Sequence, residues 1–203
     1  MKKPNDFRGQ LRKLRTPAQI QNFLNRLPFN FEKHGQTNRS VQEALKRKKA
    51  HCFEGALIAA AALWMQGRKP LLLDLVTIRP DFDHVIALFR EGKYWGAISK
   101  TNHNVLRYRD PIYRSVRELA MSYFNEYFLA DGKKTLRKFS KPFNLSKVPF
   151  DAWVTGQKDL TWLARKLDRS PHFNILTPKQ VRNLRKADRI EVEASGLTDW
   201  ERR

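Results

Sequence analysis

This chain of 203 residues has one cysteine, no long apolar run and half as many acidic as basic side chains. Cys52 is its one cysteine, which excludes a disulfide within the chain and a multi-cysteine zinc site. The longest apolar stretch, residues 56–65, is too short to span a bilayer, and the start of the chain has no apolar run of signal-peptide length. We therefore expect a soluble protein of a reducing compartment, most simply the bacterial-type cytoplasm, with no membrane span.

Ligand-binding motifs are also scarce. The sequence contains nine glycines, and they form no glycine-rich phosphate loop. The five histidines and the single cysteine lack the spacing of metal ligands. These absences predict that the protein holds no cofactor and no metal.

Positive charge is in excess, with 40 Lys and Arg against 20 Asp and Glu and a formal net charge of +20. The excess lies at both ends of the chain. Residues 1–50 carry 13 basic and 3 acidic side chains and residues 131–203 carry 17 and 9, whereas residues 51–130 carry 10 and 8. Basic flanks of this kind attract a polyanion, such as nucleic acid, an anionic lipid surface or an acidic protein partner. They also improve solubility by themselves, and charge does not decide between the two roles.

The centre of the chain predicts a helix followed by three strands. Residues 52–67 are apolar on all sides, which is typical of a buried central helix. The strand-like segments are residues 71–76, 84–89 and 94–99, of which the last two form a hairpin. An amphipathic pattern then predicts a helix over residues 112–128.

These elements predict an α+β fold in which a central buried helix packs on an antiparallel sheet, with helical basic flanks. We expect a basic, mobile N-terminal arm over residues 1–16 and a core domain over residues 17–145. Residues 146–203 are expected to form a helical basic C-terminal extension, packed on or near the core. Within this extension, residues 159–167 and the segment opened by Thr177-Pro178 predict helices.

Cys52 lies at the predicted start of the buried helix. Unpaired backbone N–H groups and the helix dipole at that end stabilise a thiolate, which lowers the pKa of the thiol. The same N–H groups can bind the oxyanion of a tetrahedral intermediate. The residue is therefore a candidate nucleophile, although a free cysteine taken alone is more often a small buried hydrophobe.

His84 opens the second predicted strand, after an acidic turn. A histidine that packs against the helix start can take the proton of the thiol and return it to the leaving group. The alternative is an ordinary strand-end histidine bonded to Asp81 or Asp83. His51 adjoins the candidate nucleophile, but we expect its side chain to point elsewhere.

The order of these pieces is informative: a cysteine on a helix, a histidine followed by apolar residues, then a tryptophan on the next strand. The segments that carry this order are His51–Ala56, His84–Phe89 and Gly92–Ser99. They resemble the core pattern of the transglutaminase-like superfamily, whose members have a papain-like cysteine hydrolase fold. The resemblance covers about residues 45–105. A stretch similar to Leu106–Arg114 occurs in uncharacterised bacterial transglutaminase-domain proteins.

The resemblance implies that Cys52 is the nucleophile and that His84 is the general base and acid. The orienting aspartate of the family would fall four residues after the tryptophan, where this chain has Ser99. A serine accepts a hydrogen bond from imidazole but brings no negative charge. Asn102, a residue type that papain-like families use, and more remotely Asp110 are candidates to replace the aspartate. A triad, a working dyad and a fold that has lost its activity all stay open.

Two functions follow from these observations. The first is a cysteine hydrolase or acyl transferase that acts on an amide or peptide bond of a protein or peptide substrate through an acyl-enzyme on Cys52. The second is a catalytically inactive fold of the same kind that acts as a basic nucleic-acid-binding or scaffold protein. The net charge supports the second function, although no zinc-finger spacing, ribonucleoprotein signature or clear helix-turn-helix accompanies it.

Overall fold

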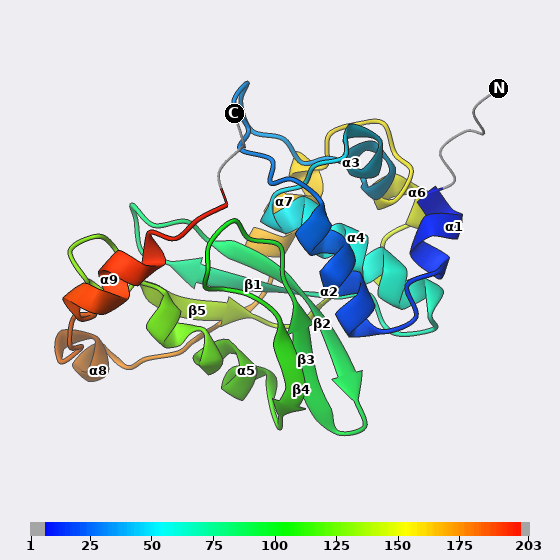
Figure 1. Cartoon of the computed structure of the whole chain (residues 1–203). Coiled ribbons are helices and arrows are strands. Elements are labelled where there is room, and N and C mark those ends of the chain that lie inside the picture. The colour runs from blue at the N-terminus through cyan, green and yellow to red at the C-terminus, as the bar shows by residue number, and fades with distance from the viewer. Residues whose placement is uncertain (1–6, 200–203) are drawn as a thin grey trace.

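The computed structural model describes residues 7–199 of the chain. In this range the protein is an α+β fold built on one antiparallel seven-stranded sheet in the order β4-β3-β2-β1-β5-β7, with β6 also paired to β1 (Figure 1). The strands are β1 Leu71–Thr77, β2 His84–Glu91, β3 Tyr94–Ile98, β4 Arg109–Tyr113, β5 Leu136–Ser140, β6 Phe143–Asn144 and β7 His172–Asn174. The mixture of helices with an antiparallel sheet confirms the α+β class.

Helices cover both faces of the sheet. Around α4 on one face lie α1, α2, α3, α6 and α7, whereas α5 packs on the other face (Figure 1). The helices are α1 Phe7–Arg12, α2 Pro17–Arg26, α3 Val41–Arg47, α4 Cys52–Met65, α5 Val116–Ser122, α6 Phe150–Trp153, α7 Thr161–Asp168, α8 Pro178–Arg182 and α9 Arg189–Ser195, with short 3-10 turns η1 Phe124–Glu126 and η2 Leu145–Lys147. Among the described residues, no helix has the length and apolar character needed to cross a membrane.

Side chains alternate across the strands and build a core on each face of the sheet, because the side-chain period of a strand is two. Leu72 and Ala87 are partners in the β1–β2 register and face α4, in the larger core. Leu73 and Leu88 face the opposite side, where they belong to a second core with Leu119 of α5. The sheet is therefore buried on both faces around β1 and β2.

α4 is the central helix that the sequence predicts over residues 52–67. Its run of small side chains, residues 59–62, is fully buried, and such residues let neighbouring elements approach closely. Gly55 is required for one such approach, since a Cβ atom at this position would lie 2.3 Å from Cβ of Lys100. The segment that follows β3 can therefore cross the start of α4, where Cys52 lies.

The three predicted strands are confirmed as β1, β2 and β3. β2 and β3 form the expected hairpin, in which Glu91 pairs with Tyr94. Gly92 in its turn has a φ of 57°, which suits a residue without a Cβ atom. This hairpin places His84 at the start of one strand and Ser99 just after the end of its neighbour.

The predicted helix over residues 112–128 is wrong at both ends, because α5 covers only Val116–Ser122 and is followed by the 3-10 turn η1. The segment begins as the edge strand β4, in which Pro111 is tolerated because an edge strand has an unpaired side. Ile112, which counted as the first helical residue, is 65% exposed. The helix α5 starts only after Ser115, whose side chain accepts from the backbone N–H of Glu118.

The basic segment over residues 1–16 is not a mobile arm in its described part. Residues 7–12 form α1, and both Phe7 and Leu11 are buried in the larger core. Residues 1–6, which also belong to the predicted arm, lie outside the described residues. The N-terminal segment is therefore built into the domain from residue 7 onward.

The predicted C-terminal extension over residues 146–203 contributes to the same core and the same sheet. Trp153, Leu163 and Leu167 are buried in the larger core, and β7 pairs with β5. The two helices expected here are present as α7 and α8, whereas α9 and β7 were not predicted. Residues 200–203 lie outside the described residues.

Candidate active site

Cys52 is the first residue of α4 and is partly exposed. At this end of a helix the first backbone N–H groups have no partner in a preceding turn, and the helix dipole is positive. Gly55 donates its backbone N–H to the carbonyl of His51, which is the first hydrogen bond of the helix. The thiol therefore lies where backbone groups favour a negative charge.

His84 is buried at the start of β2, and its ring is held by a serine. Nε2 of His84 lies 2.7 Å from Oγ of Ser99. The hydroxyl of Ser99 donates its own proton to the carbonyl oxygen of Leu106, at 2.5 Å. Because that proton is engaged, Oγ accepts from Nε2–H of the ring. Nδ1 is then the nitrogen left for Cys52, whose thiol pKa His84 helps to lower.

The backbone around Ser99 is fixed from two sides. The backbone N–H of Ser99 donates to Oε1 of Gln21 at 2.9 Å, and Nε2 of Gln21 donates to the carbonyl of Ser99 at 2.8 Å. The next residue, Lys100, is buried, and its ammonium donates to the carbonyls of Leu24 and Leu27 at the end of α2. These bonds position the serine that orients His84.

Leu106 completes this chain of hydrogen bonds in a strained conformation. Its φ is 60°, in the left-handed region that costs a branched residue about 1–2 kcal/mol. The backbone N–H of Leu106 donates to Oε2 of Glu126 at 2.7 Å, and Glu126 in turn pairs with Arg109 at 2.5 Å. The ring of His84 is therefore connected to a carboxylate only through Ser99 and a peptide group, and that carboxylate is already neutralised by an arginine.

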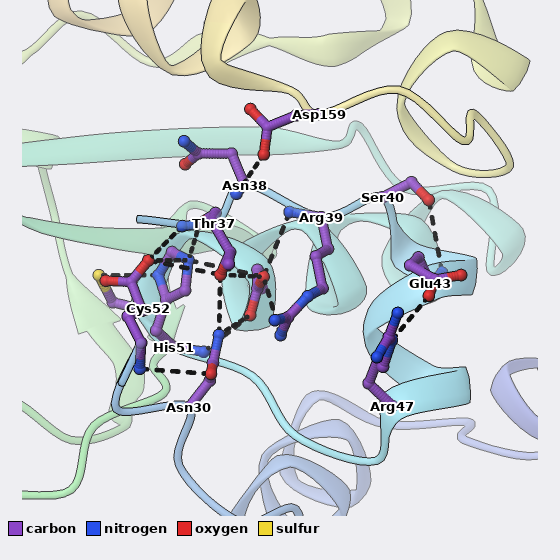
Figure 2. Close-up of polar contacts among 12 residues, drawn as sticks. Asn30, Thr37, Asn38, Arg39, Ser40, Glu43, Arg47, His51, Cys52 and Asp159 are labelled. Atoms are coloured by element: carbon purple, nitrogen blue, oxygen red, sulfur yellow. Dashed lines mark hydrogen bonds and ion pairs between the residues drawn. The ribbon is translucent and has the colours of Figure 1, made fainter. Parts of the chain in front are cut away.

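A second imidazole lies on the other side of the thiol. Nδ1 of His51 is 4.0 Å from Sγ of Cys52, and Nε2 donates to the carbonyl oxygen of Thr37 at 2.6 Å (Figure 2). Nε2 is also 3.7 Å from a carboxylate oxygen of Glu54 and 3.7 Å from one of Glu32. His51 thus joins the thiol to two acidic side chains.

Glu54 is fully buried one turn into α4 and has several donors. Its carboxylate accepts from the side chains of Asn30 and Thr37 and from the backbone N–H groups of Arg39 and His51, all within 3.2 Å. The guanidinium of Arg39 is 3.6 Å away. With these donors the buried carboxylate is fully hydrogen-bonded, and it holds the loop before α3 against the start of α4.

The electrostatics of Cys52 and His51 are complementary. Burial raises the pKa of the Cys52 thiol, but hydrogen bonds and positive charge from His51 and His84 outweigh burial and hold that pKa well below its ordinary value. Burial lowers the pKa of His51, but the hydrogen bond to Cys52 and the charges of Cys52 and Glu54 outweigh it and raise the pKa to about 9. The two shifts together favour a thiolate–imidazolium pair.

The pair lies on the wall of a cavity of about 620 Å³. Residues of the loops before α3, between β1 and β2, and after β3 line this cavity. They include the three reactive side chains and residues that could meet a bound molecule: His51, Cys52, His84, Phe82, Asn102 and Tyr127. The thiol is therefore accessible from a space of the size that a short peptide segment needs.

The structure brings together only some of the candidate catalytic residues that the sequence singled out. Cys52, His84 and Ser99 form one connected group. Asn102 lines the same cavity, but within the described residues its side chain makes no hydrogen bond, and its backbone carbonyl accepts from the N–H of Asp199. Asp110 is exposed on β4 and does not line the cavity. The serine, not the asparagine or the more remote aspartate, is the residue that contacts the His84 ring.

Sequence reasoning missed His51, Glu54 and Gln21. The expectation that His51 points away from the thiol is wrong, because an N-cap residue can turn its side chain back over the first helical turn. Glu54, three residues after His51, is at the position where a carboxylate reaches back to the N-cap N–H, so a local signal existed. Gln21 lies 78 residues from Ser99, and no local pattern indicates their contact.

Within residues 7–199, no group of three or more His, Cys, Asp or Glu side chains is arranged to hold a metal ion. The chain matches no protein-family model, and no curated protein matches it. The chemistry of the site is therefore inferred from its own geometry.

Proposed function

We propose that this protein is a transglutaminase-like cysteine hydrolase or acyl transferase that acts on an amide or peptide bond through an acyl-enzyme on Cys52. The observation that carries the proposal is the environment of the thiol. Cys52 lies at the start of a long helix, between His51 and His84, and opens onto a cavity of about 620 Å³. A buried hydrophobic cysteine needs none of these features.

The acylation step uses the groups around the thiol. The thiolate of Cys52 attacks the carbonyl carbon, the S–C bond forms, and the carbonyl oxygen becomes an oxyanion. The backbone N–H of Cys52, at the positive end of α4, is directed to donate to that oxygen. His84, protonated on Nδ1, gives that proton to the leaving nitrogen as the C–N bond breaks.

The deacylation step reverses these roles. A water molecule or an amine loses a proton to Nδ1 of His84 and attacks the acyl carbon, and the thiolate leaves. Hydrolysis results when water attacks, and acyl transfer results when an amine attacks. Both reactions use the same two side chains, so one site serves either outcome.

Glu54 gives this site the negative charge that Ser99 does not supply, and places it beside His51 instead of His84. The imidazolium of His51 stabilises the thiolate directly, and Glu54 stabilises the imidazolium. His84 then needs only to be oriented, which the hydroxyl of Ser99 does. We therefore treat His51 as a positioning residue for the thiolate and His84 as the residue that moves protons.

The arrangement of elements supports the transglutaminase-like core as well. The nucleophile begins the central helix α4, the histidine begins β2, and the residue that orients it follows β3. This is the order in which the resemblance of His51–Ala56, His84–Phe89 and Gly92–Ser99 to that superfamily assigns the same roles.

The test is the rate of Cys52 alkylation by iodoacetamide as a function of pH, in native and in denatured protein. The chain has one cysteine, so the reaction reports on this thiol alone, and Cys52→Ser gives the blank. In the native protein we expect a midpoint well below that of the denatured chain, which has a free-thiol pKa of about 8.5. Equal midpoints in the two states would refute the proposed function.

A second candidate function is polyanion binding, and one surface favours it. Trp162, Arg165, Lys166 and Arg169 are exposed along α7. With Phe143 they line a groove of about 590 Å³. Within the described residues, the three basic side chains take part in no ion pair. An aromatic ring among unpaired cations suits single-stranded nucleic acid, whose bases stack and whose phosphates pair with arginine.

This candidate predicts salt-sensitive binding that does not depend on the thiol. Fluorescence anisotropy of a labelled single-stranded oligonucleotide measures it. We expect the Arg165→Ala and Arg169→Ala double variant to weaken binding at low salt, whereas Cys52→Ala leaves it unchanged. No binding by the unmodified protein at low salt would dismiss this function and leave the cysteine chemistry untouched.

A further inference from the structure

The charge of the cavity is opposite in sign to that of the chain. Four carboxylates line it: Glu32, Asp81, Asp83 and Glu126. Lys100 is the one lysine or arginine among the described lining residues, and its ammonium is directed at backbone carbonyls of α2 rather than at the acids. In a protein with a formal net charge of +20, the thiol therefore opens onto an acidic space.

Two of the four carboxylates are already compensated. Glu126 forms its ion pair with Arg109 and accepts from the backbone N–H of Leu106. Glu32 lies 3.7 Å from the ring of His51, whose raised pKa makes it a cation at neutral pH. These two acids belong to the framework of the site and are not available to a ligand cation.

Asp81 and Asp83 have no such counter-charge. Asp81 accepts from the backbone N–H of Phe82 and from the hydroxyl of Thr135, and Asp83 accepts from the backbone N–H and the hydroxyl of Thr77. All of these donors are neutral, and within the described residues neither aspartate forms an ion pair. Both lie in the loop that leads directly into His84, so their charge is held beside the reacting groups.

The same cavity offers apolar contacts around these two acids. Phe82, between them in the sequence, is 79% exposed, and Phe29, Phe31 and Phe128 also line the space. An exposed phenylalanine between two unpaired carboxylates suits an apolar stem that ends in a cation. Lysine and arginine side chains have this form, and their cations also bind aromatic faces.

The unpaired hydroxyl of Tyr127 indicates that such a side chain would belong to a peptide. This residue lines the cavity and is 3% exposed, and its hydroxyl has no hydrogen-bond partner among the described residues. Buried hydroxyl groups are nearly always hydrogen-bonded in native structures. A peptide carbonyl in the cavity would supply the missing acceptor, which neither a metal ion nor a protonated amine could do.

We propose that the acyl donor of this enzyme is a peptide that carries a lysine or arginine side chain beside the bond attacked by Cys52, with its cation bound by Asp81 and Asp83. This inference rests on the proposed cysteine chemistry and adds the substrate class. The acids select the side chain, and Tyr127 donates to a carbonyl of the peptide backbone. The overall positive charge of the protein predicts the reverse, a preference for anions. An experiment can therefore separate the effect of the net charge from the effect of the two aspartates.

The first experiment compares three methanethiosulfonate reagents that carry a trimethylammonium, a methyl or a sulfonate group. In each case the thiolate of Cys52 attacks the divalent sulfur of the reagent, an S–S bond to Cys52 forms, the bond to the sulfonyl sulfur breaks, and methanesulfinate leaves with its electron pair. Relative to the denatured chain, we expect the native protein to favour the cationic over the anionic reagent by about tenfold, as two unscreened charges near the thiol would produce. A faster reaction with the anionic reagent would overturn the inference.

Variants locate the source of this preference. In the double variant Asp81→Asn with Asp83→Asn, the nearby negative charge is gone. We therefore expect the ratio of the reaction rates of the cationic and anionic reagents to fall to within about twofold of its value in the denatured chain. The matched control is Asp110→Asn with Asp151→Asn, which removes the same charge from exposed positions outside the cavity and should leave the ratio unchanged. An equal fall in both double variants would show that the overall charge decides the ratio, which contradicts the inference.

The second experiment tests the peptide itself with acetyl-lysyl-glycinal and acetyl-glutamyl-glycinal. Sγ of Cys52 adds to the aldehyde carbon, and the oxygen takes a proton to give a reversible thiohemiacetal. We expect the lysyl compound to bind about tenfold more tightly, and Tyr127→Phe to weaken both compounds without changing their ratio. Equal affinities, or tighter binding of the glutamyl compound, would refute the proposed substrate class.

The neutral reagent separates a failure of this inference from a failure of the proposed function. If its reaction with native protein at acid pH is no faster than with denatured protein, the thiolate is not activated and both proposals fail. If that reaction is fast and the charged reagents show no cation preference, only the substrate class fails.

Discussion

The two sides of Cys52 differ in how each imidazole is supported. On one side, the Nε2 of His84 meets the neutral hydroxyl of Ser99. On the other side, the ring of His51 lies 3.7 Å from Glu54, a fully buried carboxylate. The negative charge that the transglutaminase-like pattern would place beside the first ring is therefore beside the second ring in this chain.

Under the proposed function, this difference divides the tasks of a single histidine and aspartate between two histidines. Ion-pair formation with the thiolate needs a stable imidazolium, which His51 provides because its pKa is raised. Proton transfer needs a ring that gains and loses a proton easily, and a carboxylate in direct contact would oppose the loss. His84, which is held by a hydroxyl and not by a carboxylate, is the residue to which we assign this second task.

Of the variants considered, His84→Gln should have the largest effect, a loss of turnover. It removes the residue to which we assign proton transfer and leaves the ion-pair side intact. We expect turnover of a peptide amide to fall by about 10²–10⁴-fold, the usual contribution of a general base and acid. Steady-state kinetics measures this, with circular dichroism as a check of the fold. A fall of less than threefold would mean that His51 moves the protons, and the assigned tasks would be reversed.

Glu54→Gln removes the carboxylate that supports the other ring. Its partners, including Arg39 and His51, would keep buried positive charge without a counter-ion. We expect the free energy of unfolding to fall by about 3–5 kcal/mol, measured by urea denaturation. Glu43→Gln is the matched control: its ion pairs with Lys46 and Arg47 are solvent-exposed, so we expect a loss below about 1 kcal/mol. Similar losses in the two variants would show that the buried carboxylate has no special role.

His51→Gln tests the ion pair through pH. In the unmodified protein the pair exists above the lowered pKa of Cys52 and below the pKa of His51, about 9. The variant should raise the pKa of the thiol and slow iodoacetamide alkylation at pH 6 by about tenfold, which corresponds to one unit of pKa. The unmodified protein should also show a second rise in rate near pH 9, because a thiolate without its imidazolium is more nucleophilic. Identical pH profiles for the two proteins would contradict this role of His51.

Ser99→Ala should have the smallest effect. The ring of His84 loses the acceptor of its Nε2–H, and the orientation of the ring becomes looser. We expect about a tenfold loss of turnover, the equivalent of one hydrogen bond. Asn102→Ala is the control, since its side chain does not contact the ring, and it should change turnover by less than about twofold. The opposite ranking would assign the asparagine to the orienting position.

The sequence predicted the central elements because their patterns are local. The helix over residues 52–65 is apolar on all sides, and the three strands that follow it are bounded by turn residues. The error over residues 112–128 has a tertiary cause, since only pairing with β3 makes residues 109–113 a strand. The burial of α1 likewise depends on the core that receives Phe7 and Leu11.

The site was less predictable than the fold. Cys52 and His84 could be singled out because each opens its own element. The choice of Ser99 over Asn102 depends on the conformation of Leu106 and on Gln21, which no local pattern shows. The cytoplasmic location, the polyanion partner and the substrate stay predictions.

The pH titration of the thiolate absorbance in the ultraviolet tests the central claim most directly, because it reports the charge of Cys52 without a reagent or a substrate. The difference between the unmodified protein and Cys52→Ser isolates the signal of the one cysteine. The thiolate–imidazolium pair predicts a midpoint well below that of a free thiol, about 8.5, and a midpoint that moves upward in His51→Gln. A midpoint at or above the free-thiol value would contradict the account.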